Sequence, residues 1–84
     1  MGVGRRVSEA AVRADQTTET GRARVLAAVV ALCAREPREP SVKVLAEATG
    51  LSRNYVGAAL LHLERRLLVT RRHAGAVVRW RATP

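Results

Sequence analysis

The sequence has no phenylalanine, one cysteine and very few aromatic side chains. Tyr55 and Trp80 are the only aromatic residues, so Ala, Val and Leu must supply most of a core. Cys33 is the only cysteine, which excludes an intrachain disulfide and a zinc site built from cysteines. A reducing cytoplasm is the location that we expect for such a protein.

Long apolar runs and catalytic constellations are also absent from the sequence. The longest apolar run, Val25 to Ala34, is far shorter than the roughly 20 residues of a membrane span, and no apolar segment typical of an export signal follows the first arginines. His62 and His73 are far apart in the chain, and no pair of acidic residues accompanies them. We therefore expect no membrane association, no enzymatic activity, no metal, no cofactor and no small-molecule ligand.

Acidic residues are scarce, and the positive charge is unevenly distributed. Seven Asp and Glu residues stand against fifteen Lys and Arg residues, which gives a formal charge of +8. Six of the eight excess charges fall within residues 51–84, which contain seven arginines and one glutamate. A GC-rich genome explains part of the preference for Arg over Lys, but not this clustering. The clustering indicates a polyanionic partner, since guanidinium groups bind phosphates and guanine edges through paired hydrogen bonds.

The length of 84 residues allows one domain of modest stability. Residues 1–19 combine glycines, mixed charges and a polar stretch, which predicts a flexible N-terminal arm. Residues 20–84 are predicted to form the folded domain. Its first helix is predicted over residues 21–35, where apolar residues recur at spacings of three and four. These apolar residues are Val25, Leu26, Val29, Val30, Leu32 and Cys33.

Two shorter helices are predicted after a stiff connector in which Glu36 and Glu39 each precede a proline. Ser41 is a good N-cap and Gly50 a good C-cap for a helix over residues 42–49. Ser52 caps a third helix over residues 52–66, and a Gly-Leu-Ser turn between two such helices is typical of a helix-turn-helix. The residues expected to face the core are Val44, Leu45 and Ala48 in the second helix, Leu51 in the turn, and Val56, Leu60, Leu63 and Leu67 in the third.

After the third helix the apolar period changes from about 3.6 to 2. Two β-rich runs surround the glycine-containing tip at residues 73–75 and predict a hairpin, or wing, over residues 68–81. We expect Trp80 to close the core between this hairpin and the first helix. The fold class expected is mainly α with a small β-hairpin, in the form of a three-helix winged helix-turn-helix.

One stretch of the chain resembles a known group of proteins. The run Val44-Leu45-Ala46-Glu47-Ala48-Thr49-Gly50-Leu51-Ser52, followed by Val56, Leu60, Leu63-Glu64 and Leu68-Val69, is similar to the pattern of prokaryotic winged-helix regulators of the multiple-antibiotic-resistance and arsenical-resistance kinds. The resemblance covers about half of the chain. It implies a winged helix that binds DNA and regulates transcription, for example as a repressor.

The chain departs from this pattern at Leu67, where such families usually have a glycine that ends the third helix. Either the helix passes into the strand through a tighter turn, or Leu67 adopts a strained conformation. A second resemblance, to the left-handed-DNA-binding winged helices of the adenosine-deaminase kind, rests on Trp80. It fails on the third helix, where Gly57 and Leu61 stand in place of that family's asparagine and tyrosine.

The N-terminal end of the third helix is the part expected to enter the major groove. Arg53 can bind guanine O6 and N7, and Asn54 can bind adenine N6 and N7; the less favoured alternative is that both are ordinary solvated residues after the cap. The Ala58 methyl can meet a thymine methyl, and the Ser52 hydroxyl suits a phosphate. Tyr55 flanks this surface or packs against the second helix. The residues predicted to contact DNA here are Ser52, Arg53, Asn54, Tyr55, Gly57 and Ala58.

Basic residues also gather in the predicted wing. Like charges on adjacent strands repel one another unless an anion lies over them, and DNA phosphates would supply that anion. The residues predicted to contact phosphates or the minor groove are Arg71, Arg72, His73 and Arg79, with Arg81 nearby.

The leading functional hypothesis from the sequence is therefore sequence-specific binding of double-stranded DNA. The protein would be a small, nucleoid-associated transcriptional regulator, or the DNA-binding module of a plasmid, phage or chromosomal system. A homodimer through residues 1–35 that reads a palindrome is expected, with a monomer on repeated sites as the alternative. The competing function is a winged helix that mediates protein–protein interaction without reading DNA.

Overall fold

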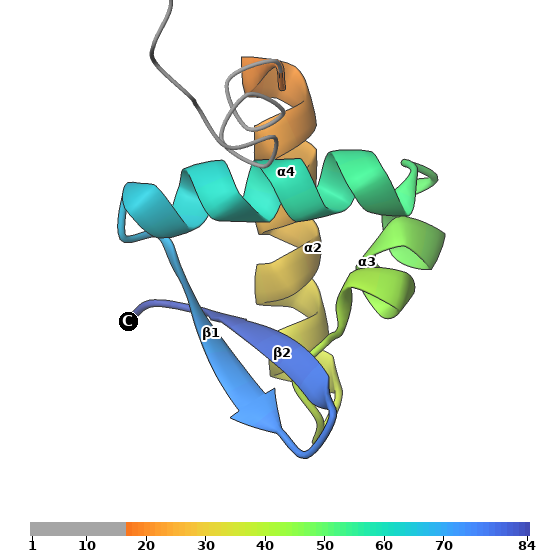
Figure 1. The fold of residues 1–84 in the computed structure, drawn as a ribbon, viewed down its shortest axis with the longest axis vertical. Coiled ribbons are helices and arrows are strands. Elements are labelled where there is room, and N and C mark those ends of the chain that lie inside the picture. The colour runs from red at the N-terminus through yellow and green to blue at the C-terminus, as the bar shows by residue number, and fades with distance from the viewer. Residues whose placement is uncertain (1–16) are drawn as a thin grey trace, which may run out of the picture.

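The fold consists of helices followed by a hairpin (Figure 1). In this computed structural model, residues 17–84 are described. They form three helices, α2 (Glu19–Arg35), α3 (Val42–Thr49) and α4 (Arg53–Arg65), and two antiparallel strands, β1 (Val69–Ala74) and β2 (Val77–Ala82). Helix α4 crosses α2, α3 lies beside the N-terminal end of α4, and the hairpin leaves its other end (Figure 1). The predicted winged helix-turn-helix is confirmed, while residues 1–16 of the predicted arm lie outside the described residues.

Helix α2 begins two residues earlier than predicted. Thr18 is its N-cap, because Thr18 Oγ1 accepts a hydrogen bond from the Gly21 N–H at 3.0 Å. Thr18 acts as a cap although no glutamate follows three residues later to complete a capping box. The sequence therefore indicated only weakly where this helix begins. Val29 is buried, whereas Val30, which was expected to face the core, is exposed. One residue along a helix turns the side chain by about 100°, away from the buried stripe.

The helix-turn-helix lies where the sequence placed it. Ser41 Oγ accepts a hydrogen bond from Val44 N at 3.3 Å, and Gly50 ends α3 with a φ of 75°. Leu45 is the buried residue of α3, while Val44 and Ala48, which were predicted to face inward, are exposed. The side chains of α3 that pack against the core are Val42, Leu45 and Ala46, which follow the helical spacing of three and four, so Val44 and Ala48 lie off this stripe.

The hydrophobic core lies where α2, α3, α4 and the hairpin meet. Trp80 is only 4% exposed and packs in this core, as predicted, and its carbonyl accepts a hydrogen bond from Cys33 Sγ at 3.7 Å. The backbone N–H of Trp80 donates to the Pro40 carbonyl at 2.9 Å, so the connector between α2 and α3 runs beside β2. The buried core residues are Val25, Val29, Leu32, Leu45, Val56, Ala59, Leu60, Leu63, Val69 and Trp80.

The structure decides between the two alternatives for Leu67. Its φ is 63°, in the left-handed region, and its side chain is 77% exposed, so it does not continue the buried stripe of α4 as predicted. The Leu67 N–H donates to Glu64 O and the Leu68 N–H donates to Leu63 O, both at 2.9 Å. These two bonds form a Schellman motif with a leucine at the position that usually belongs to glycine.

Leu67→Gly is therefore expected to stabilise the protein by roughly 0.5–1 kcal/mol, since glycine removes the steric cost of a left-handed residue and little buried surface is lost. The midpoint of urea unfolding, measured at constant m-value, checks this expectation. Gly50→Ala is the reciprocal control, because it places a Cβ on a residue with a φ of 75° and should lower the midpoint. A lower midpoint for Leu67→Gly would show that Leu67 is not strained.

Candidate nucleic-acid interface

The N-terminal end of α4 presents an open polar surface. Ser52, Arg53 and Asn54 are exposed, at the end of α4 that lies beside α3 (Figure 1). Ser52 Oγ accepts the Tyr55 N–H at 3.1 Å as the N-cap, which leaves its hydroxyl hydrogen available to a phosphate oxygen. Within residues 17–84, neither the Arg53 nor the Asn54 side chain has an intrachain hydrogen bond or ion pair. A Cβ at Gly57 would meet no atom within 4 Å, so one helical turn later the surface is still open.

Tyr55 differs from its predicted role because it contacts α2 instead of the open surface. Its hydroxyl lies 3.0 Å from both Thr18 N and Thr18 Oγ1, and a Cβ at Gly21 would overlap that hydroxyl. The hydrogen bonds with Thr18 hold the pKa of the Tyr55 phenol below its ordinary value. The tyrosine therefore packs against the first turn of α2 and links α4 to that helix.

Ala58 also differs from the expectation. Its side chain is only 5% exposed although it lies outside the hydrophobic core cluster. Its methyl group is therefore not available to a thymine in the described conformation. The small residue that keeps this face of α4 open is Gly57.

The register of the wing brings fewer like charges together than the sequence suggested. Arg72 lies opposite Arg79, whereas Arg71 lies opposite Trp80 and His73 opposite Val78. A single cross-strand pair of arginines therefore needs a compensating anion in this hairpin. His73 is exposed beside the hairpin tip, and Arg81, which lies opposite Thr70, is also exposed.

Arg71 is neutralised within the chain by Glu64. Its Nε and Nη2 atoms donate to the two carboxylate oxygens of Glu64 at 2.8 and 2.7 Å, and its guanidinium lies 5.1 Å from the ring centroid of Trp80. The paired hydrogen bonds lower the pKa of Glu64 and raise that of Arg71. The structure gives less support to Arg71 as a phosphate contact, because its Nε and Nη2 donors are already bonded to the Glu64 carboxylate.

The Glu64–Arg71 pair predicts an acid dependence of stability. Because the folded pKa of Glu64 is lowered, its contribution is fully present above the unfolded value near 4.5 and is lost as the pH falls through the folded value. Both side chains are about one-third exposed, so we expect this contribution to be less than about 1 kcal/mol. Urea unfolding between pH 6 and 3 should be less pH-dependent in Glu64→Gln than in the parent. Equal pH dependence in the two proteins would contradict the pairing.

Glu39 binds two further arginines of the wing, Arg72 and Arg79. Its carboxylate Oε1 accepts from Arg72 Nε at 2.9 Å, and its backbone carbonyl accepts from Arg79 Nη1 at 2.8 Å. The sequence interpretation missed Glu39 and Glu64 as partners of the wing, and assigned the compensating anion to DNA. A signal was present for Glu64, which is the single acidic residue among the seven arginines of residues 51–84.

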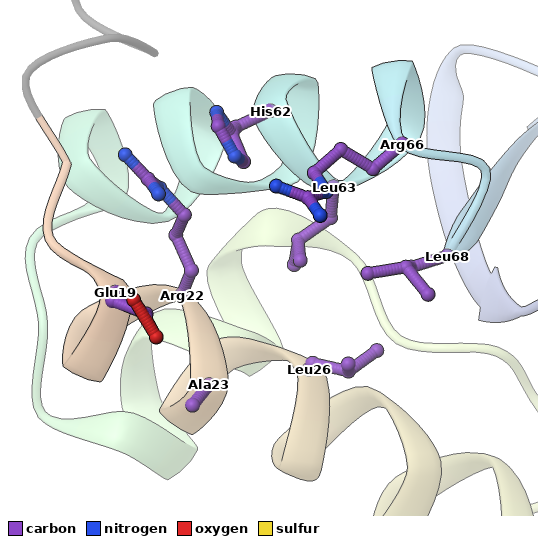
Figure 2. A pocket seen from close by; sticks show the side chains of 8 residues that line it. All are labelled: Glu19, Arg22, Ala23, Leu26, His62, Leu63, Arg66 and Leu68. Carbon is purple, nitrogen blue, oxygen red and sulfur yellow. The ribbon is translucent and has the colours of Figure 1, made fainter.

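An open cavity of about 350 Å³ lies between α2 and the C-terminal half of α4, where the sequence indicated no pocket (Figure 2). Its apolar part is formed by leucines from both helices and from the start of the wing, and its polar part by arginine, histidine and glutamate side chains. The lining residues are Glu19, Arg22, Ala23, Leu26, His62, Leu63, Arg66 and Leu68. Arg22 is held by Thr17, whose side-chain oxygen accepts its Nε–H at 2.8 Å and whose carbonyl accepts its Nη2–H. The cavity is on the opposite half of α4 from the exposed Arg53.

Residues 17–84 lack the features of two other classes of site. No helix in this range has the length and apolar character of a membrane span. The same residues contain no cluster of three or more His, Cys, Asp or Glu side chains suited to a metal ion.

The fold is similar to a solved structure from Lactococcus lactis, that of ZitR in a mutant form with one cysteine replaced by serine. The TM-score is 0.58 with 21% sequence identity, and the similarity covers 96% of this chain. This chain spans about half, 49%, of the length of ZitR. No family model matches the sequence, and no curated protein does either. At this level of identity the comparison supports one conclusion, which is that the chain has a winged helix-turn-helix fold.

Proposed function

We propose that this chain binds double-stranded DNA in a sequence-specific manner and acts as a small transcriptional regulator. The observation that carries the proposal is the exposed pair Arg53 and Asn54 at the N-terminal end of α4, whose side chains have no partners among residues 17–84. Their donors and acceptors match the major-groove edges of guanine and adenine, and the helix-turn-helix is the arrangement that places this end of a helix in the groove.

The charge of the chain supports the same proposal. Of the formal charge of +8, six units come from residues 51–84, which form α4 and the wing. Such a concentration of guanidinium groups attracts the phosphate backbone and steers association. His73 and Arg81 are exposed in the wing, and we propose that they contact phosphates together with Ser52 and Arg72.

The resemblance to prokaryotic regulators supports the finer parts of the proposal. These are a repressor in the cytoplasm, associated with the nucleoid, that forms a homodimer through the N-terminal arm and α2. Val30 is an exposed hydrophobic residue on α2 and suits such a contact. Sedimentation at micromolar concentration tests the dimer, because it distinguishes the mass of one chain from that of two. A monomer would be expected to bind repeated sites instead of a palindrome.

Selection of bound sequences from a random duplex library tests the function. We expect one motif to be enriched, and affinity for random duplex to fall steeply between about 50 and 200 mM salt, as counterion release requires. Binding to neither random nor selected duplex, even at the lowest salt, would overturn the proposal.

Failure of DNA binding would favour the competing function, a protein-interaction module. One observation supports that alternative: Arg71, Arg72 and Arg79 are each hydrogen-bonded to a glutamate within the chain. A wing in which three of the four arginines already have internal partners can serve as a scaffold without any contact to phosphate.

A further inference from the structure

We propose that Glu39 is an intramolecular competitor of DNA phosphate, which holds the Arg72 guanidinium in the free protein and limits the affinity of the wing for DNA. The inference rests on the proposed function. It adds a residue outside both α4 and the wing that lowers the affinity of the wing for DNA. Glu39 lies in the connector between α2 and α3, 33 residues before Arg72.

The geometry places the Glu39 carboxylate where a phosphate would lie. The wing pairs Arg72 directly with Arg79 across the strands, and Glu39 bonds to both, through its carboxylate to Arg72 and through its carbonyl to Arg79. An oxygen that accepts from a guanidinium Nε at 2.9 Å has the position and charge of a phosphate oxygen. The connector is kept in place by the bond from Trp80 N to Pro40 O.

The exposure of the two partners makes this contact replaceable. The Arg72 side chain is 63% exposed, whereas the Glu39 side chain is 21% exposed. The carboxylate is therefore fixed against the protein while much of the guanidinium faces solvent. An exposed ion pair of this kind contributes little to stability, so a phosphate can displace it at small cost. The displaced carboxylate stays nearby and repels the phosphate that replaced it.

Arg72 and Arg79 are held by different atoms of Glu39, which allows a specific test. Glu39→Gln removes the charge facing Arg72 but keeps the backbone carbonyl that binds Arg79. We expect Glu39→Gln to bind random duplex about fivefold more tightly at low salt, the size of one unit-charge interaction at about 4 Å in water. The slope of log affinity against log salt should become steeper by up to about 0.9, the value for one phosphate contact, because the parent makes the contact at Arg72 only in part.

Glu36→Gln is the matched control, because it removes the same charge from an exposed residue of the same connector. It should leave affinity and salt slope close to those of the parent. The gain from Glu39→Gln should also disappear in an Arg72→Ala background, since the competition requires that guanidinium. Equal gains from Glu39→Gln and Glu36→Gln, or a gain that persists with Arg72→Ala, would overturn the inference. Circular dichroism of each variant confirms that it is folded.

Elution from a heparin column separates failure of this inference from failure of the proposed function. Heparin is a polyanion without base sequence, and Glu39→Gln should elute at higher salt than Glu36→Gln. A parent that does not bind duplex would refute DNA binding, whereas the heparin shift would still report competition at Arg72. Equal elution of the two variants would refute the competition, whether or not the parent binds duplex.

Discussion

Replacing Arg53 with alanine is expected to weaken binding to the selected DNA site by about 1–3 kcal/mol and to remove the preference at one base pair. Arg53 is exposed at the N-terminal end of α4. Its guanidinium has no side-chain partner among residues 17–84 and is therefore available for a bidentate contact with a guanine. Competition binding against a panel of single-base variants of the site measures both effects.

Arg66→Ala is the matched control, because Arg66 is an exposed arginine at the opposite end of α4 and lines the cavity there. It removes the same charge, so it should reduce affinity for all sequences slightly and leave every base preference unchanged. Retention of all base preferences in Arg53→Ala would show that this end of α4 does not read DNA. Loss of the same preference in Arg66→Ala would show that charge, and not contact, explains the effect.

Replacing Gly21 with alanine is expected to destabilise the fold by about 1–3 kcal/mol, the usual cost of overpacking a closely packed site. A Cβ at Gly21 would overlap the Tyr55 hydroxyl oxygen and would lie 2.6 Å from Tyr55 Cζ. The ring must then move, which breaks its hydrogen bonds with Thr18. Helix propensity alone predicts the opposite sign, since alanine in a helix is favoured over glycine by about 1 kcal/mol.

Gly57→Ala is the control for Gly21→Ala, because it makes the same change in a helix where a Cβ meets nothing within 4 Å. It should stabilise the protein by roughly 0.5–1 kcal/mol. Urea unfolding of both variants, and of Gly21→Ala combined with Tyr55→Leu, measures the effect. The double variant should lose less stability than the sum of its single changes. Stabilisation by Gly21→Ala would show that Tyr55 does not pack as closely as described.

Several features could be predicted from the sequence because they depend on short-range chemistry. The caps of α3 and α4 are serines whose hydroxyls accept a bond from an N–H three residues later, and Gly50 supplies the left-handed residue that ends α3. The alternation of apolar residues in the last third of the chain indicated the hairpin. Each of these signals lies within a few neighbouring residues, so helix bounds were correct to within about two residues.

The sequence by itself therefore determined the fold class, the bounds of the helix-turn-helix and the excess positive charge of its C-terminal part. The tertiary structure alone decided which polar groups remain free for a partner. Tyr55 bonds to Thr18 at a separation of 37 residues, and Arg72 bonds to Glu39 at a separation of 33. Composition and periodicity carry no trace of such pairs, because they depend on which segments the core brings together. The same packing left Arg53 and Asn54 exposed and gave three of the four arginines of the wing internal partners.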